Sequence, residues 1–534
     1  MLIDLEKATA DLTLNADICI VGAGAAGVAL ARKLMPLGHE VCLLESGGMD
    51  FEERTQDLFA GENIGMEYYD LDHARLRFFG GTTNIWGGRN IPLDRIDFQK
   101  RDWVPHSGWP ITLDQLNPYY KAAHDSLELG EFEYSHKLWE KLPVDPVDFA
   151  AETLSTHFWR FDGFAERFNS RRCTDLVNSG NVKIVLHANT VGLQASVGAK
   201  GITALNARTL SGTKLLVQAK HYVLACGAIE NARLLMASND VESNGIGNSR
   251  DLVGRFFMEH PHGRIAHLET RDPAAFWAHH RKRYTAGIVP VAPAVVMTEE
   301  LQKRLGVLNS AATFKLQKDP EKGASLSHRA YMNMKHKMSP TKSGRRVWQT
   351  WRGAQNTLQR HLAMPLLRIG VFINSLSIYV MARAEQAPNP ASRVVLSQEK
   401  DALGQHRANL DWRMCSLDKE TMLQFGNTLK SEMGRLGVGK ITTCEWLEDG
   451  RPEWPNDPSV GNHPIGGYHH MGTTRMSDSP ETGVVDKNCT VHGYDNLHIA
   501  GSSVFTTGGW ANPTLTILAL SHRLGEHLDR LMSK

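Results

Sequence analysis

The strongest constraint on the fold lies near the N-terminus, where a glycine-rich turn joins a strand to a helix. Residues 17–21 (DICIV) are apolar and predict a short buried strand, and residues 28–37 carry apolar side chains at helical spacing. Between them, Gly22, Gly24 and Gly27 have the spacing GxGxxG. Gly38 follows as the residue that ends the helix.

The residues around this turn predict a dinucleotide site. Gly22 permits the tight turn, Gly24 lets a pyrophosphate approach the backbone, and Gly27 lets the helix pack closely on the sheet. The helix N-terminus directs the positive end of its dipole at the phosphates. A second strand is predicted over residues 40–44, and Glu45 at its end is placed to accept hydrogen bonds from an adenosine ribose. This pattern alone does not separate FAD from NAD. The expected cofactor contacts here are Gly22, Gly24, Ala26, Gly27, Glu45 and Ser46.

The composition is that of a globular protein with more than one domain. A chain of 534 residues is too long for one ordinary hydrophobic core. Its formal net charge of +1 gives no general attraction to nucleic acid or to a membrane surface. The seven cysteines form no CxxC pair, so neither a disulfide framework nor a metal site is predicted. Residues 1–16 lack the apolar stretch of a secretory signal, and the apolar residues 366–382 are interrupted by polar ones. We therefore expect a cytoplasmic protein without a transmembrane segment.

Two further segments combine glycines with polar side chains. Residues 75–90 (RLRFFGGTTNIWGGRN) predict backbone laid close against a flat or phosphorylated group, the alternative being a glycine-rich surface loop. Residues 221–236 (HYVLACGAIENARLLM) predict a buried strand, a turn at Gly227 and a helix, a pattern that ordinary α/β packing also produces. Residues 182–186 and 203–208 are expected to be strands at the edge of a small sheet. The expected cofactor contacts in these segments are Gly81, Thr82, Thr83, Asn84, Trp86, Gly87, Val191, Ala225 and Gly227.

The C-terminal residues carry the predicted chemistry. Residues 496–520 (NLHIAGSSVFTTGGWANPTLTILAL) predict a short strand, a glycine-rich turn and a long apolar helix capped by Asn512. The N-terminus of that helix would favour an anionic, reduced flavin in front of it. His469 and His470 lie in the preceding loop GGYHHMGTTRM, where an imidazole can accept an alcohol proton, although histidines in loops are more often solvated or structural. The expected cofactor contacts here are Gly501, Ser502, Asn512, Pro513 and Thr514.

Five segments, in the same order and spacing, carry a resemblance to a known family. They are DICIVGAGAAG with Glu45, GGTTNIWGG, VLACGAIENARLL, HHMGTTRM and NLHIAGSS…WANPTLT. Together they resemble the glucose–methanol–choline (GMC) family of FAD-dependent oxidoreductases, and most closely its pyranose oxidase and sugar dehydrogenase branch. The resemblance implies that His469 is the catalytic histidine of the HxxGT pattern and that Asn512 is the second member of the pair.

The resemblance also implies a fold and a division into domains. The expected fold is α/β: a Rossmann-like FAD-binding domain with a discontinuous α+β substrate-binding domain whose sheet is covered by helices on one face. The FAD-binding domain would comprise residues 1–96, 172–260 and 462–534, and the substrate-binding domain residues 97–171 and 261–461.

The chain departs from the family pattern at three positions of the cofactor site. Some members attach FAD covalently to a histidine in the glycine-rich loop, but Ile85 occupies that position here, so we expect non-covalent FAD. Gly501 replaces the acidic residue that many relatives have after the late strand, and Phe505 replaces a proline. Backbone amides, Ser502 or Ser503 would then have to supply the contacts at that point.

The expected function is FAD-dependent oxidation of an alcohol, and the favoured substrate is a sugar or glycoside. His469 would abstract the hydroxyl proton while hydride passes to the flavin, and oxygen, a quinone or a cytochrome-type redox protein would then accept the electrons. The alternatives are oxidation of an aryl or aliphatic alcohol, a non-redox FAD-containing lyase of the same fold, and an NAD-dependent dehydrogenase. The sequence does not indicate an oligomeric state.

The substrate-binding part of the chain is the least informative. His470, Trp510 and His260 are candidate substrate residues, although structural histidines are the commoner case. Residues 382–396 predict a strand–turn–strand unit around a Pro-Asn-Pro turn. Residues 322–384 contain several Arg and Lys and no Asp or Glu, which indicates a basic helical surface or a docking face for a redox protein, a membrane surface or a second subunit.

Overall fold

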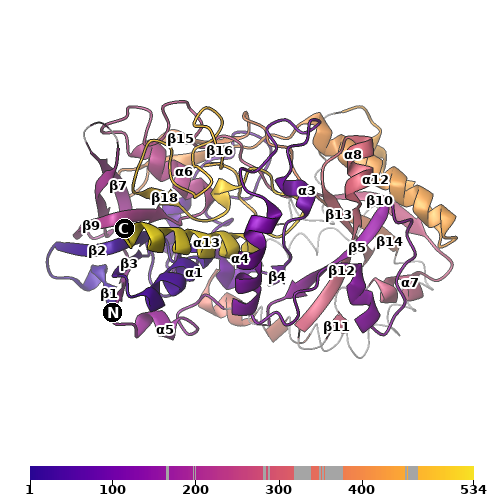
Figure 1. The fold of residues 1–534 in the computed structure, drawn as a ribbon, viewed down its shortest axis with the longest axis horizontal. Coiled ribbons are helices and arrows are strands. Elements are labelled where there is room, and N and C mark those ends of the chain that lie inside the picture. The colour runs from indigo at the N-terminus through magenta and orange to yellow at the C-terminus, as the bar shows by residue number, and fades with distance from the viewer. Residues whose placement is uncertain are drawn as a thin grey trace.

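The computed structural model shows an elongated molecule with one large sheet toward each end (Figure 1). It describes residues 1–163, 167–196, 198, 200–280, 284–286, 289–317, 338, 340–347, 350–351, 354, 377–451, 454 and 467–533. Most of the basic segment 322–384 lies outside these residues, so the interpretation of that segment as a docking face stays a prediction.

The first sheet contains the dinucleotide motif. Its strands follow the order β1 (Leu2–Asp4), β6 (Val182–Leu186), β3 (Val41–Leu44), β2 (Leu12–Val21), β9 (Lys214–Leu224), β8 (Ile202–Arg208) and β7 (Asn189–Ala195), with β18 (Leu497–Ile499) also paired to β9. The pairs from β1 to β9 and the pair β9–β18 are parallel, and β7 and β8 extend the sheet antiparallel. This is the Rossmann-like half of the predicted α/β fold. The expected edge position of residues 182–186 and 203–208 is wrong, because β6 lies between β1 and β3, and β8 lies between β9 and β7.

Helices follow the parallel strands as the sequence predicts. α1 (Ala25–Leu34) follows β2, α6 (Ala228–Ala237) follows β9, and α13 (Thr514–Met532) follows β18. α13 packs along both α1 and α4 (Leu113–Ser126) across one face of the sheet (Figure 1). The buried side of α13 includes Leu515, Leu518 and Leu528, so apolar side chains at helical spacing fix it there.

The second sheet is antiparallel and forms the other end of the molecule. Its order is β17 (Lys440–Thr443), β10 (His262–Glu269), β14 (Ser377–Ala384), β13 (Ser310–Gln317), β12 (Val289–Met297), β5 (Leu154–Phe161) and β4 (Arg89–Asn90), with β11 (Tyr284–Ala286) paired to β12. Ile378, Val380 and Ala382 of β14 form a core with Met422 and Phe425, which come from α12 (Ser416–Arg435). The alternate residues of β14 therefore lie on the opposite face.

Short helices lie in the connections between the strands of both sheets. They include α2 (Glu53–Gln56), α3 (Arg95–Phe98), α5 (Thr174–Val177), α7 (Pro273–His279) and α8 (Glu299–Leu305). A separate hairpin of β15 (Arg393–Lys400) and β16 (His406–Asp411) packs on α6. The predicted strand–turn–strand order over 382–396 is confirmed, since β14 ends at Ala384 and β15 begins at Arg393 after a turn. The two strands do not pair with each other: β14 pairs with β10 and β13, and β15 pairs with β16.

The described residues contain neither a disulfide bond nor a helix suited to span a membrane. No disulfide joins any of the seven cysteines, and none of the described helices is long and apolar enough to cross a membrane. The domain boundaries stated in the sequence analysis remain a prediction.

Candidate functional site

A cavity lies at the carboxyl ends of β2, β3 and β9, in front of the N-terminus of α1. This is the position at which open α/β sheets bind dinucleotides. Most of the predicted cofactor contacts line it, and so does His470, which was predicted on the substrate side. The predicted lining residues are Gly22, Gly24, Ala26, Glu45, Ser46, Gly81, Thr82, Thr83, Ala225, Gly227, Gly501 and Ser502.

The shape of this cavity suits a dinucleotide. Gly22 has a φ of 104°, and a Cβ there would meet the carbonyl oxygen of Ala225 at 2.6 Å. A Cβ on Gly24 would meet no protein atom within 4 Å and would project into open space. Gly24 therefore leaves room for a ligand at the N-terminus of α1, where backbone N–H groups and the helix dipole favour phosphate.

Glu45 closes one side of the cavity. It is 5% exposed, and its carboxylate accepts hydrogen bonds from the backbone N–H groups of Ala23 at 3.1 Å and Gly47 at 2.9 Å. Burial raises the pKa of this carboxyl group, while the two backbone bonds oppose the increase. The group is thus held rigidly at the end of β3, where an adenosine ribose would present its hydroxyls.

Several predicted contacts lie outside the cavity lining. A Cβ on Gly27 would collide with the carbonyl oxygen of Gly22, so Gly27 serves helix packing. Asn84 donates to the carbonyl oxygens of Phe79 and Gly81 and so holds the glycine-rich loop. Thr190, the neighbour of Val191, lines the cavity in its place. The other predicted contacts that do not line this cavity are Trp86, Gly87, Asn512, Pro513 and Thr514.

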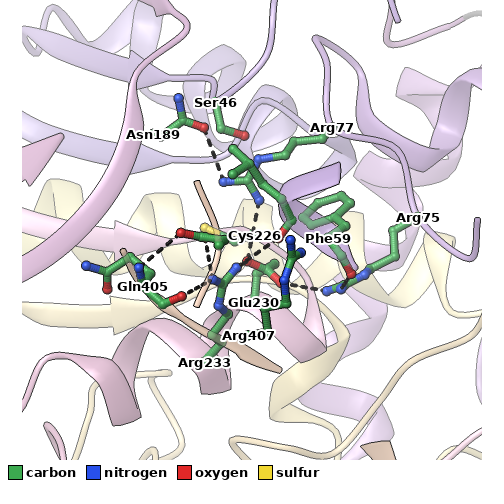
Figure 2. Close-up of polar contacts among 12 residues, drawn as sticks. Ser46, Phe59, Arg75, Arg77, Asn189, Cys226, Glu230, Arg233, Gln405 and Arg407 are labelled. Atoms are coloured by element: carbon green, nitrogen blue, oxygen red, sulfur yellow. Dashed lines mark hydrogen bonds and ion pairs between the residues drawn. The ribbon is translucent and has the colours of Figure 1, made fainter. Parts of the chain in front are cut away.

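A buried ionic cluster beside the cavity escaped the sequence analysis (Figure 2). Glu230 accepts from Arg75 at 2.7 Å, from Arg77 at 3.4 Å and from Arg233 at 3.3 Å, and Arg233 also pairs with Asp401 at 2.6 Å. Burial raises the pKa of Glu230, but the three guanidinium groups outweigh it and lower the pKa to about 2. The cluster leaves positive charge in excess next to the cavity. The spacing of Glu230 and Arg233 on one helix face was the available signal.

The second half of the site centres on His469, which lies three residues before Gly472 in the HxxGT pattern. Its Nε2 lies 3.3 Å from Nδ2 of Asn512, and its Nδ1 lies 2.8 Å from Nδ1 of His260. Nε2 of His260 in turn lies 2.8 Å from the carbonyl oxygen of Gly509. The structure therefore brings together His469 and Asn512, which are far apart in sequence, and places His260 behind His469.

This chain of contacts fixes the proton positions. A carbonyl oxygen only accepts, so His260 must donate from Nε2 to Gly509. Burial lowers the pKa of His260 to about 3, so the ring is neutral and its Nδ1 must accept the hydrogen bond from Nδ1 of His469. Nε2 of His469 is then the unprotonated nitrogen, and its lone pair accepts the 3.3 Å hydrogen bond from the amide of Asn512. Burial also lowers the pKa of His469 well below its usual range, so the lone pair is available at neutral pH.

The buried carboxylate of Glu259 holds the backbone of both His260 and His469. Its carboxylate accepts from the backbone N–H of His260 at 2.7 Å, from the backbone N–H of His469 and from the hydroxyl of Tyr68 at 3.0 Å. Burial raises the pKa of Glu259 to about 7 despite these bonds. The Tyr68 hydroxyl also lies 2.6 Å from Nε2 of His470, which ties the histidine that lines the dinucleotide cavity to the same network.

The loop before α13 differs from the predicted helix cap. α13 begins at Thr514, with Pro513 rather than Asn512 at its N-cap and no side-chain cap. The side chain of Asn512 turns to His469 instead, and its Oδ1 is buried without a hydrogen-bond partner among the described residues. An unpaired buried acceptor at this point favours a donor supplied by a ligand. Trp510 donates from Nε1 to Asp94 at 2.9 Å and packs on Trp159, so it supports the loop.

Comparison with known proteins accounts for this arrangement. The sequence profile described as GMC oxidoreductase matches residues 388–521, which include His469 and Asn512. The chain is 24% identical to 2-methyl-1,2-propanediol dehydrogenase of Mycolicibacterium austroafricanum, over 97% of this chain and 96% of the relative. It is 23% identical to the fructose dehydrogenase large subunit of Gluconobacter japonicus, over 96% of this chain and 98% of the relative. The chain is therefore similar to GMC oxidoreductases along nearly its whole length, and residues 388–521 match the family profile itself.

Solved structures show the same fold. A formate oxidase covers 98% of this chain with a TM-score of 0.55 at 18% identity, and the match includes 100% of that chain. Pyridoxine 4-oxidase from Mesorbium loti covers 96% with a TM-score of 0.53 at 15% identity, and 99% of that chain is matched. The protein is an FAD-binding oxidoreductase, and the glycine cradle, the buried Glu45 and the unpaired Oδ1 of Asn512 fit that cofactor.

Two residues of this site were absent from the sequence analysis. Glu259 precedes His260 in the segment FFMEHPHG, and an acidic residue inside an apolar stretch was the available signal. Arg383 of β14 lies with its Nη1 3.4 Å from Nδ1 of His469. Nothing local in the sequence indicates this contact, because it depends on the register of β14 in the second sheet.

Proposed function

We propose that this oxidoreductase oxidises an alcohol group of a sugar or a related polyol, with His469 as the general base. The observation that carries the proposal is the set of contacts around His469: its Nε2 faces the amide of Asn512, and its Nδ1 faces His260, which in turn faces the carbonyl oxygen of Gly509. The relatives support the substrate class by their names, which include a diol dehydrogenase, a fructose dehydrogenase and two aminoglycoside oxidases of Streptomyces. The electrons are passed on to oxygen, a quinone or a cytochrome-type acceptor.

Bound FAD supplies the two-electron acceptor for the carbinol carbon. The chain supplies the proton chemistry: Nε2 of His469 accepts the hydroxyl proton, and Nδ1–H of the same ring keeps its hydrogen bond to His260. Asn512 fixes the position of Nε2 from one side, and its unpaired Oδ1 can accept a hydrogen bond from a ligand. Because both rings are neutral before the reaction, the base is ready without a prior deprotonation.

The same reasoning gives the proposed cofactor contacts. The cavity-lining residues from Gly22 to Ser502 would hold the dinucleotide, with Glu45 at the ribose and the N-terminus of α1 at the phosphates. Ile85 offers no nucleophile for a covalent link, so the FAD is expected to be released by acid precipitation. Flavin that stays in the protein pellet would contradict this.

The test is anaerobic reduction of the enzyme-bound flavin, which is monitored as a loss of flavin absorbance. A panel of sugars, polyols, glycosides and aryl alcohols identifies the substrates, and His469→Ala is then compared with wild type on the best one. Loss of a general base typically costs about 10²- to 10⁴-fold in rate, while the flavin content should be unchanged. Reduction of the variant at a near-normal rate would refute the role of His469. Failure of every alcohol to bleach the wild-type flavin would refute alcohol oxidation itself and favour a non-redox enzyme.

A further inference from the structure

Arg383 is a cation on the face of the second sheet that carries the active site. Ile378, Val380 and Ala382 of β14 point into the core under α12, so Arg383, two residues beyond Met381, points the other way. Its Nη1 lies 3.4 Å from Nδ1 of His469. The guanidinium therefore contacts the imidazole ring whose other nitrogen, Nε2, is proposed to take the alcohol proton.

No described carboxylate forms an ion pair with Arg383, although the residue is only 8% exposed. The charge of Glu259 raises the pKa of Arg383, but the Glu259 oxygens are occupied by the N–H groups of His260 and His469 and by the Tyr68 hydroxyl. His469 does not compensate for the charge, because its Nδ1 carries a proton that it donates to His260. A buried guanidinium without an anion is costly, so a charged partner from outside the chain would stabilise it.

The surroundings of Arg383 are also positive. Arg89 lies close enough to lower the pKa of Arg383, with burial as the main cause, to about 9. Both guanidinium groups approach the ring of Trp159, with centroid distances of 5.8 Å for Arg89 and 5.9 Å for Arg383. The positive charge of Arg383 also lowers the pKa of His262, its cross-strand neighbour, after the larger effect of burial.

A second, independent feature points to a ligand here. Nε1–H of Trp159 is buried and has no acceptor among the described residues. An indole N–H can only donate, so this orphan donor and the guanidinium beside the same ring both require an acceptor. One anionic oxygen group placed next to Trp159 would satisfy both.

We propose that Arg383 binds the carboxylate of a hydroxy acid, such as a sugar acid, whose hydroxyl group is presented to Nε2 of His469. This inference rests on the alcohol oxidation proposed above and narrows its substrate class. A planar guanidinium and one further N–H match a carboxylate in geometry and in charge. In the reaction the carbinol carbon becomes a carbonyl carbon, its hydrogen and two electrons go to FAD, and the hydroxyl proton goes to His469. The carboxylate is unchanged.

The first experiment compares matched substrates on the FAD-loaded enzyme. An aldonic or uronic acid, its methyl ester, its primary amide, the parent neutral sugar and the sugar phosphate are each tested by anaerobic flavin reduction. The acid should exceed its ester and amide by about 10²-fold or more in kcat/KM, the size expected for a charge-assisted pair in a dry site. A neutral sugar as good as its acid would overturn the inference and leave alcohol oxidation standing. A sugar phosphate better than the acid would overturn the choice of a carboxylate.

The second experiment tests the residue itself. Arg383→Met should abolish the preference for the acid over its amide, while Arg383→Lys, which keeps the charge, should restore part of it. Arg413→Met, at an exposed arginine paired with Asp411, is the control and should keep the wild-type preference. An unchanged preference in Arg383→Met would overturn the inference.

A binding measurement separates the two proposals. A deoxy acid, which has no hydroxyl to oxidise, should perturb the flavin absorbance of wild type and His469→Ala but not that of Arg383→Met. If the deoxy acid binds in this way and no alcohol is oxidised, the anion site stands and the proposed function falls. If the deoxy acid binds equally well to Arg383→Met, the anion site is refuted whatever the activity.

Discussion

The dinucleotide end of the site and the end at His469 are made of different parts of the protein. The first is mainly backbone: glycines of the β2–α1 turn, the loop at Gly81 and the turn at Gly227. The second consists of side chains that the fold collects from distant segments, such as Glu259, Arg383 and Asn512. A backbone cradle depends on steric room, whereas a side-chain cluster depends on proton positions and charge. Substitutions at the dinucleotide end should therefore affect stability and flavin binding, whereas substitutions at the His469 end should affect the rate of flavin reduction.

The sharpest steric test is a pair of alanine substitutions in the same turn. In Gly27→Ala the new Cβ collides with the carbonyl oxygen of Gly22, which cannot move away easily because it is backbone. We expect a loss of stability of about 1–3 kcal/mol or more and purified protein with little flavin. Gly24→Ala adds its Cβ in open space, so it should lose flavin while the protein alone keeps its thermal stability.

Flavin content and melting temperature, with and without added FAD, distinguish these outcomes. If Gly24→Ala binds FAD as wild type does, the cavity in front of α1 does not hold the phosphates. If Gly27→Ala has the wild-type melting temperature, the steric account of this turn is wrong.

The contrast between the two ends also explains what the sequence could predict. β2–α1–β3 and β9–α6 are confirmed because apolar periodicity and glycine spacing are local signals. The strand–turn–strand order at 382–396 is confirmed as well, but its two strands join different sheets, because both edges of β14 pair with segments remote in sequence. For the same reason Arg383 could not be foreseen: its place beside His469 follows from the pairing of β14 with β10 and β13. The roles of His469 and Asn512 stay predictions.

Among the residues that contact His469 at the side-chain end, Asn512 should show the largest effect when it is replaced by Asp. The structure has an amide N–H donating to Nε2 of His469. A carboxylate in its place would accept instead, hold a proton on Nε2 and occupy the lone pair. We expect flavin reduction to slow by about 10²- to 10³-fold, as for removal of one well-placed donor in other active sites. Asn512→His, which can still donate, should retain more activity. The measurement is the anaerobic reduction rate at saturating substrate, and equal rates for the two variants would contradict the account.

His260 acts through His469, so its replacement should be milder. Nδ1 of His260 accepts the proton of His469 and thereby keeps the lone pair on Nε2. His260→Phe removes that acceptor, and about a 10- to 100-fold loss in rate is expected for a positioning partner of this kind. His260→Asn offers an acceptor oxygen and should recover part of the loss. A structural defect alone would lower the reduction rate of both variants equally and leave the pH dependence of kcat/KM unchanged. A change of the His469 tautomer would instead shift the acidic limb of the kcat/KM profile in His260→Phe.

The smallest predicted effect is the contribution of His470 to the pH dependence of protein stability. His470 lines the dinucleotide cavity and also contacts Tyr68 of the network at His469. Burial lowers the pKa of His470 to about 3, so the folded protein favours the neutral ring while the unfolded chain titrates near 6.5. The stabilisation is therefore fully present above about pH 6.5 and is lost as the pH falls toward 3. One such group contributes a slope of at most about 1.4 kcal/mol per pH unit. His470→Gln, which does not titrate, can keep a hydrogen bond to Tyr68 and should flatten the fall in melting temperature between pH 6.5 and 4. If wild type and variant lose stability in parallel over this range, His470 is protonated equally in both states and is not held neutral by the fold.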